Sequence, residues 1–261
     1  MLEATDRSER SGHDDLRERI RLLAADLHGD GHVPLDPAEL LTQVTWAAVE
    51  LLPEIDHAGI TLVARAGKKS RPHELTSTAP TGPVPAEVDA LQHAYDEGPC
   101  FEAIWRERTV RIDDLSTETR WPAFVAAALE ATPVRSSMSM QLFVGEMELG
   151  ALNLYSDRPG SISRATEYLA EDLATHAAIA LLGARRQQQF RSALASRDII
   201  GQAKGVLMER FAIDAVAAFD LLRRLSQESN TRLADIAERL LASGVGTSAV
   251  TARPTRNLTE E

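Results

Sequence analysis

Hydrophobic residues recur at helical spacing near the start of the chain and define two predicted helices. The first covers 14–28, where apolar side chains fall three or four positions apart, and glycines at positions 29 and 31 end it. The second starts at Asp36, which supplies an N-cap oxygen, and continues with Pro37 and Glu39 in its first turn. Its apolar positions form one stripe: Leu40, Leu41, Val44, Ala48 and Leu51. We therefore expect a short N-terminal helix followed by the first helix of a folded domain.

The middle of the chain alternates between short strands and short helices. Strands are predicted over 58–64, 75–78 and 109–112, and helices over 84–96, 100–108 and 121–130. The clearest strand is 134–144, in which apolar residues alternate with polar ones. It is followed, after Gly145 and Glu146, by a return strand over 148–155, so the two form a hairpin. This order of elements predicts an α+β domain.

From Ser163 onward the pattern is helical to the end of the ordered region. Eight positions at alternating spacings of four and three form a pattern typical of a coiled-coil seam, although the centre of this seam is polar or small: Leu169, Leu173, His176, Ala180, Gly183, Gln187, Phe190 and Leu194. A helix packed on its own sheet up to residue 182 explains the first half equally well. The stretch from Arg185 is too polar for a core, so it is predicted to be an exposed helical connector.

Residues 197–243 predict a compact unit of three helices. Its expected core comprises Ile199, Ile200, Ala203, Val206, Leu207 and Phe211 on the first helix, Ala218, Phe219, Leu222 and Leu225 on the second, and Leu233, Ile236, Ala237, Leu240 and Leu241 on the third. Asp214 is the expected N-cap of the second helix. A core of this size has limited stability, so help from the connector or from a second copy is expected.

Charge divides the chain into two parts. The net charge is −11, but residues 185–243 carry ten Lys and Arg against seven Asp and Glu, whereas residues 1–184 carry a net charge of −14. The acidic part should repel phosphate and the C-terminal unit should not. The chain has one cysteine, Cys100, and no apolar run long enough to span a membrane. Its first residues lack the pattern of a signal peptide, so a cytoplasmic location is expected.

Two glycines mark an exposed face of the first C-terminal helix. Gly201 and Gly205 lie one turn apart, opposite the predicted core, and flank Lys204. Each costs about 1 kcal/mol relative to alanine inside a helix, so the pair requires an explanation. Close approach of a ligand backbone, with Lys204 meeting a phosphate, is one explanation; close packing at a dimer seam is the other.

Cationic residues on the second and third helices extend this surface. Arg223, Arg224 and Arg232, with Asn230 at the turn, suit phosphates and the base edges of single-stranded loops. A solvated helix face explains the same charges without any ligand.

The C-terminal unit resembles an ANTAR domain, the RNA-binding antitermination module of bacterial regulators. The resemblance covers roughly 194–243 and is carried by Ala203-Lys204-Gly205-Val206-Leu207-Met208, Ala218-Phe219, Leu222-Arg223 and Ile236-Ala237. It implies pairing through an adjoining coiled coil, hence a homodimer, and binding of tandem RNA hairpins that favours an antiterminator over a terminator. The RNA-contacting residues that it implies are Lys204, Gly205, Arg223, Asn230 and Arg232.

The region over 36–183 looks like a GAF domain. The order of its elements fits that fold, and Glu97-Gly98-Pro99-Cys100 recurs in actinobacterial GAF–ANTAR regulators. The resemblance implies an antiparallel sheet flanked by helices and a small-molecule ligand of unspecified identity. Cys100 follows a Gly-Pro turn at the start of a predicted helix, so it is either a redox-sensing thiol or a buried structural one. Trp105, Trp121 and Phe124 either line a ligand pocket or fill the core.

The sequence gives little support for an enzyme. His28 and His32 have metal-like spacing, but Gly29 and Gly31 break the helix that a site would need. Ser-His-Asp and Cys-His arrangements, P-loops and dinucleotide fingerprints have no local signature. We therefore predict a regulator that is not an enzyme and holds no metal, with two alternatives: a protein-interaction adaptor without RNA binding, and a thiol or metal enzyme. Its predicted segments are an N-terminal extension over 1–35, a GAF-like domain over 36–183, a helical connector over 184–196, an all-α three-helix ANTAR domain over 197–243 and a disordered tail over 244–261.

Overall fold

The computed structural model describes residues 18, 19, 22, 25, 36–64, 74–144 and 147–244. It divides into two units, Met1–Gln187 and Gln188–Glu261, which are described separately. Most of the predicted helix over 14–28, the pair His28 and His32, and the predicted tail beyond Gly244 lie outside the described residues.

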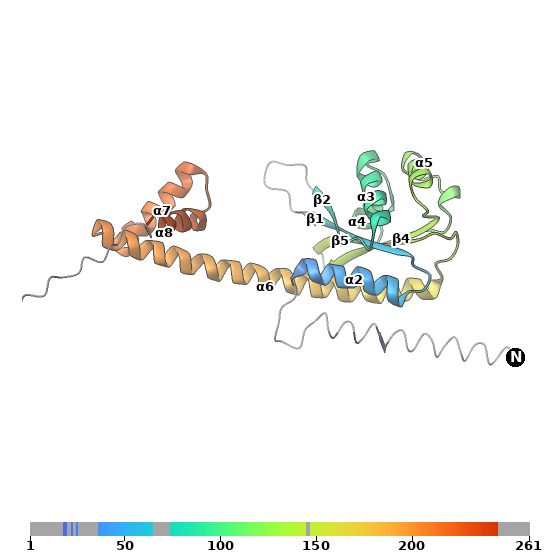
Figure 1. The fold of residues 1–261 in the computed structure, drawn as a ribbon, viewed down its shortest axis with the longest axis horizontal. Helices are drawn as coiled ribbons and strands as arrows, with labels where there is room; N and C mark the ends of the chain where they lie inside the picture. The colour runs from blue at the N-terminus through green and yellow to red at the C-terminus, as the bar shows by residue number, and fades with distance from the viewer. Residues whose placement is uncertain are drawn as a thin grey trace, which may run out of the picture. The chain divides into compact units, whose positions relative to one another are not determined.

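The first unit is built on an antiparallel sheet (Figure 1). Its five strands lie in the order β2-β1-β5-β4-β3. Their bounds are β1 His57–Ala64, β2 Glu74–Thr78, β3 Thr109–Ile112, β4 Ser136–Val144 and β5 Met147–Ser156. The predicted hairpin of β4 and β5 forms the centre of the sheet, with Met138 opposite Leu154 and Ser139 opposite Asn153. The alternation in β4 therefore gives the two faces of the sheet different character.

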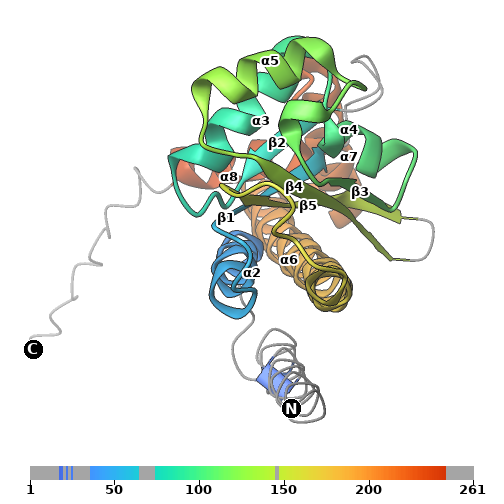
Figure 2. The same cartoon turned by 90° about the vertical axis from the view of Figure 1, so that its right-hand side faces the viewer.

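One face of the sheet is apolar and is covered by two helices, α2 (Pro37–Leu51) and α6 (Arg164–Phe211) (Figure 2). Asp36 caps α2 as predicted, because its carboxylate accepts the backbone N–H of Ala38 at 3.4 Å. The core between these helices and the sheet is formed largely by Leu40, Leu41, Val44, Ile60, Met138, Met140, Leu152, Leu169, Leu173 and Leu181.

The opposite face carries α3 (Pro83–Tyr95), α4 (Pro99–Trp105), the short 3₁₀ helix η1 (Leu115–Thr117) and α5 (Pro122–Ala131). Figure 2 shows α3, α4 and α5 on the side of the sheet away from α2 and α6. This layer mixes apolar residues, such as Val110, Phe124 and Ala151, with buried polar ones.

A glycine in β5 permits the close pairing of β1 and β5. Gly150 has a φ of +151°, a region that side chains rarely adopt. A Cβ at this position would collide with the backbone of Thr61 and Leu62 on β1. The position therefore requires glycine.

Helix α6 is continuous from Arg164 to Phe211, so the predicted connector and the first helix of the C-terminal unit belong to one helix. The first half of the expected coiled-coil seam packs on the sheet: Leu169 and Leu173 are 3% and 1% exposed. The helix-on-sheet interpretation therefore holds for this half. Phe190 and Leu194, in the second half, are exposed.

The C-terminal unit is completed by α7 (Ala215–Ser229) and α8 (Leu233–Gly244). Asp214 caps α7 as expected, its carboxylate accepting the N–H groups of Val216 and Ala217 at 3.0 and 2.8 Å. The fully buried core is small and consists of Ala203, Leu207, Ala218, Leu222 and Ala237.

Three apolar residues predicted for this core are instead exposed. Phe211, Phe219 and Leu225 are 57%, 40% and 38% exposed, so the prediction of their burial is wrong. The buried core consists mostly of the alanines at 203, 218 and 237, and larger side chains such as Ile199, Ile236 and Leu240 are only partly buried around it.

Candidate functional site

The two glycines of the C-terminal unit face open space within their own chain. Gly201 and Gly205 are exposed, and a Cβ added at either one meets no atom within 4 Å. Lys204, between them, is half-buried on α6. A side chain would therefore fit at both positions, so contacts within the described chain do not explain why they are glycine. Approach of an RNA backbone and contact with a second copy stay open as explanations.

Arg223 lies on the solvent side of α7, held by an ion pair that can readily open. Its guanidinium is 3.0 Å from the carboxylate of Asp220, and both side chains are about half-exposed or more. An exposed pair of this kind contributes little to stability. The guanidinium can therefore leave Asp220 for a phosphate at little cost.

The turn between α7 and α8 carries Asn230 and Arg232. Asn230 has left-handed backbone angles, φ 49° and ψ 36°, and serves as the C-cap of α7. Asparagine tolerates this region better than most residues, so Asn230 has a structural reason to be there besides any contact with RNA. Arg232 is exposed, and its carbonyl accepts the N–H of Ile236 at 3.1 Å at the start of α8.

Two aromatic rings that sequence reasoning assigned to the core are exposed, and one of them, Phe219, lies next to Arg223 on α7. Phe219 precedes Arg223 by four residues, so both lie on the same side of α7. Phe211, at the end of α6, is also exposed. Exposed rings beside cationic side chains are typical of surfaces that stack unpaired bases. The four-residue spacing of Phe219 and Arg223 was a signal that the two side chains are neighbours, but it does not show whether Phe219 is buried.

Cys100 is buried in the first unit beneath α3. The Gly98 that precedes α4 has no Cβ, which leaves space for the Gln92 side chain; its amide oxygen accepts the N–H of Cys100 at 2.9 Å. Cys100 is 2% exposed, and burial, together with the charge of Asp89, raises the pKa of its thiol to about 12. A redox-sensing thiol needs a lowered pKa and access to solvent, so this environment suits a structural cysteine.

A buried carboxylic acid lies next to that cysteine. Asp89 Oδ1 accepts hydrogen bonds from the hydroxyl of Tyr155 at 3.3 Å, the amide of Gln92 at 3.4 Å and the amide of Asn153 at 3.5 Å. Burial raises the pKa of Asp89 to about 6, against the lowering effect of its hydrogen bonds and of His93. Sequence reasoning missed this group, because its partners come from α3 and from β5, 64 or more residues apart.

Replacing Asp89 with asparagine is expected to remove a pH dependence of the first unit. The pKa of Asp89 is about 6 in the folded protein and 3.8 as its ordinary value. The folded protein therefore holds the Asp89 proton more tightly than the unfolded chain does. The stabilisation that results is complete below pH 4 and is lost as the pH rises to 6. The loss is about 3 kcal/mol. Thermal unfolding from pH 4 to 8, followed by tryptophan fluorescence, should show the Asp89→Asn variant gaining on the wild type up to pH 6 and keeping its advantage above it. Parallel profiles of the two proteins would contradict the prediction.

Trp105 and Trp121 line a shared cavity of about 330 Å³, whereas Phe124 does not line it. Phe124 is 2% exposed and packs in the core. The cavity also includes Glu97 and Gly98, and the Arg120 guanidinium stacks over the Trp121 ring at 4.3 Å. The structure thus brings two of the three predicted aromatic residues together, on the same layer as Cys100.

Family models match both units of the chain. A GAF domain is matched over residues 34–182, more than half of the chain, and an ANTAR domain over residues 188–241. A search of curated proteins gives no match.

Solved structures similar to this chain include a reductase, a GAF domain and a bacteriophytochrome. The free methionine-R-sulfoxide reductase of Neisseria meningitidis is 15% identical over 66% of this chain and 91% of its own, with a TM-score of 0.47. The GAF domain of an Acinetobacter phosphoenolpyruvate-protein phosphotransferase is 15% identical over 65% and 93%, also at 0.47. A bacteriophytochrome of R. palustris is 12% identical over 82% of this chain and 46% of its own, at 0.49. The family assignment rests on the sequence models.

Within the described residues, no helix is long and apolar enough to cross a membrane, and no three potential metal ligands cluster. GAF domains are sensing modules and ANTAR domains are RNA-binding modules of antitermination, so their combination is regulatory. The chain belongs to the GAF-domain family and carries an ANTAR domain after it, as in GAF–ANTAR regulators.

Proposed function

We propose that this protein is a homodimeric regulator that binds tandem RNA hairpins through its ANTAR domain and promotes antitermination under the control of its GAF domain. The observation that carries the proposal is that Gly205 on α6 and Arg223 on α7 are exposed, with the half-buried Lys204 next to Gly205. Lys204 and Arg223 supply charge for phosphates, and Phe219 supplies a ring for an unpaired base.

Dimerisation is proposed to use a stripe of α6 that shares Phe190 with the seam suggested by the sequence but otherwise consists of other residues. Tyr168, Ile179 and Phe190 are 57%, 46% and 71% exposed and lie eleven residues apart, which places them on one side of the helix. Leu169 and Leu173 already pack against the sheet, so they are not available to a partner. A second copy of α6 would cover the exposed stripe.

Pairing matters because one small cationic surface binds weakly. Two linked surfaces raise the effective concentration of the second contact once the first has formed. A signal at the GAF domain that changes the pairing of α6 would therefore change affinity for paired hairpins far more than affinity for a single one.

Charged substitutions on the exposed stripe are expected to weaken the dimer at least about ten-fold, because burial of such a side chain contributes roughly 1.5–3 kcal/mol. Ile179→Glu and Phe190→Glu test this by sedimentation equilibrium of the full chain. Ser192→Glu is the matched control, since Ser192 is exposed on another side of the same helix. Unchanged dimerisation in both stripe variants would rule out this surface.

The function itself is tested by crosslinking tagged protein to RNA in its host and sequencing what co-purifies. Paired short hairpins near terminators should be enriched, and the enrichment should disappear in the Lys204→Glu/Arg223→Glu variant. If no RNA is enriched under several growth and stress conditions, the protein-interaction adaptor replaces this proposal.

A further inference from the structure

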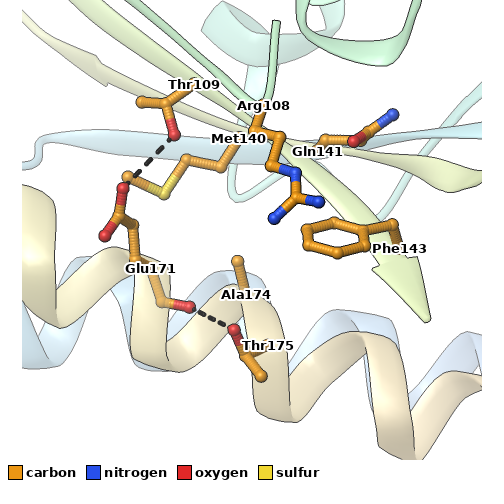
Figure 3. A pocket seen from close by; sticks show the side chains of 8 residues that line it. All are labelled: Arg108, Thr109, Met140, Gln141, Phe143, Glu171, Ala174 and Thr175. Atoms are coloured by element: carbon orange, nitrogen blue, oxygen red, sulfur yellow. Dashed lines mark hydrogen bonds between the residues drawn. The ribbon is translucent and has the colours of Figure 1, made fainter. Parts of the chain in front are cut away.

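A cavity of about 230 Å³ lies between the β3 edge of the sheet and helix α6 (Figure 3). It is on the α6 side of the sheet, away from Cys100 and the tryptophan cavity. Its apolar surface includes Met140, which is 2% exposed, and Ala174, which is 4% exposed. Its lining residues all belong to the first unit.

Two opposite charges, both on solvent-exposed residues, line this cavity, and neither forms an ion pair with a residue that the structure describes. The Arg108 guanidinium stacks over the Phe143 ring at 4.4 Å and forms no ion pair with any residue that the structure describes. The Glu171 carboxylate accepts only a long hydrogen bond, 3.5 Å, from the Thr109 hydroxyl, and likewise has no ion-pair partner among the described residues. Figure 3 shows Arg108 reaching in from the sheet side and Glu171 from the helix.

The combination selects a ligand with both charges. A simple anion would satisfy Arg108 and leave Glu171 facing the anion, and a simple cation would do the reverse. A zwitterion places a carboxylate at Arg108 and an ammonium at Glu171, and both contacts are charge-assisted hydrogen bonds. The apolar surface at Met140, Phe143 and Ala174 suits a hydrocarbon group between them.

We propose that this cavity binds a free α-amino acid with an apolar side chain. Its volume lies below the roughly 300–1,000 Å³ of pockets for drug-sized ligands, which favours a ligand of this size. Glu171 and Ala174 belong to α6, so the bound amino acid contacts the helix that continues into the ANTAR domain. The proposal concerns ligand binding alone and does not depend on RNA binding.

Calorimetry of the full-length protein with L-alanine, L-valine, L-leucine and L-phenylalanine tests the proposal. At least one of the four should bind. For L-leucine, two analogues isolate each charge: 4-methylpentanoate lacks the ammonium and 3-methylbutylamine lacks the carboxylate. Both should bind at least about ten-fold more weakly than the amino acid.

Variants then assign each charge to its residue. Arg108→Gln should abolish the preference for L-leucine over 3-methylbutylamine, and Glu171→Gln should abolish the preference over 4-methylpentanoate. Asp172→Asn is the matched control, because Asp172 is exposed on α6 and does not line the cavity. No binding of any of the four amino acids overturns the proposal, as does equal binding of L-leucine and its two analogues. Neither result bears on the RNA experiment.

Discussion

Reversing the charges of Lys204 and Arg223 in the ANTAR domain is expected to weaken RNA binding on the order of a hundred-fold. Each of Lys204 and Arg223 is expected to contact a phosphate or base, and such a contact is worth about 1–3 kcal/mol. Glutamate at either position replaces attraction by repulsion. The Lys204→Glu/Arg223→Glu variant should therefore bind a recovered tandem hairpin far more weakly in a filter or fluorescence titration.

The salt dependence distinguishes lost phosphate contacts from general damage. The logarithm of the binding constant falls linearly with the logarithm of the salt concentration, by roughly 0.7 per phosphate contact for single strands. Loss of two contacts should flatten the slope by roughly 1.4. The control is Arg158→Glu/Arg164→Glu, two exposed residues of the first unit that change net charge by the same amount. Equal weakening in the control would show that net charge, not this surface, governs binding.

Truncating Leu222 is expected to unfold the C-terminal unit. Leu222 is fully buried in a small core, which has five buried members among the residues that the structure describes. Replacing a buried leucine with alanine costs about 2–5 kcal/mol, which is a large part of the stability that so small a core can provide. Leu222→Ala should therefore lose protection of the α7 and α8 amides in hydrogen exchange.

Leu225 offers a matched control one turn along the same helix. It is 38% exposed, so Leu225→Ala removes the same atoms with a smaller loss of buried contact than Leu222→Ala. Protection of the β4 and β5 amides in the first unit should be unchanged in both variants. Similar exchange in α7 for the two variants would contradict the packing described for this unit.

Much of the fold was predictable, because its local signals agree with its tertiary contacts. The alternation in β4 continues through Met138 and Met140, and both residues face the apolar side of the sheet. The caps at Asp36 and Asp214 mark helix starts where a carboxylate meets free N–H groups. These signals act over a few residues, so the α+β class and the order of elements followed from the sequence.

What could not be predicted depends on distance in the sequence and on volume. Asp89 and Tyr155 lie 66 residues apart, and Arg108 and Glu171 meet at one cavity only because β3 pairs at the sheet edge above α6. Phe219 occupies a position that helical spacing assigns to the core, but the alanine-rich contact between the helices leaves it outside. Spacing gives the direction of a side chain along its own helix and does not give the space available opposite it.

The burial of Cys100 has a practical consequence for experiments on this protein. With its pKa near 12, this thiol has roughly three orders of magnitude less thiolate at neutral pH than an exposed cysteine. Maleimide and methanethiosulfonate reagents should therefore not react with Cys100 in the folded protein. Cysteines introduced on α6 or α7 can carry spin labels or fluorophores in the native background, with Cys100 left in place.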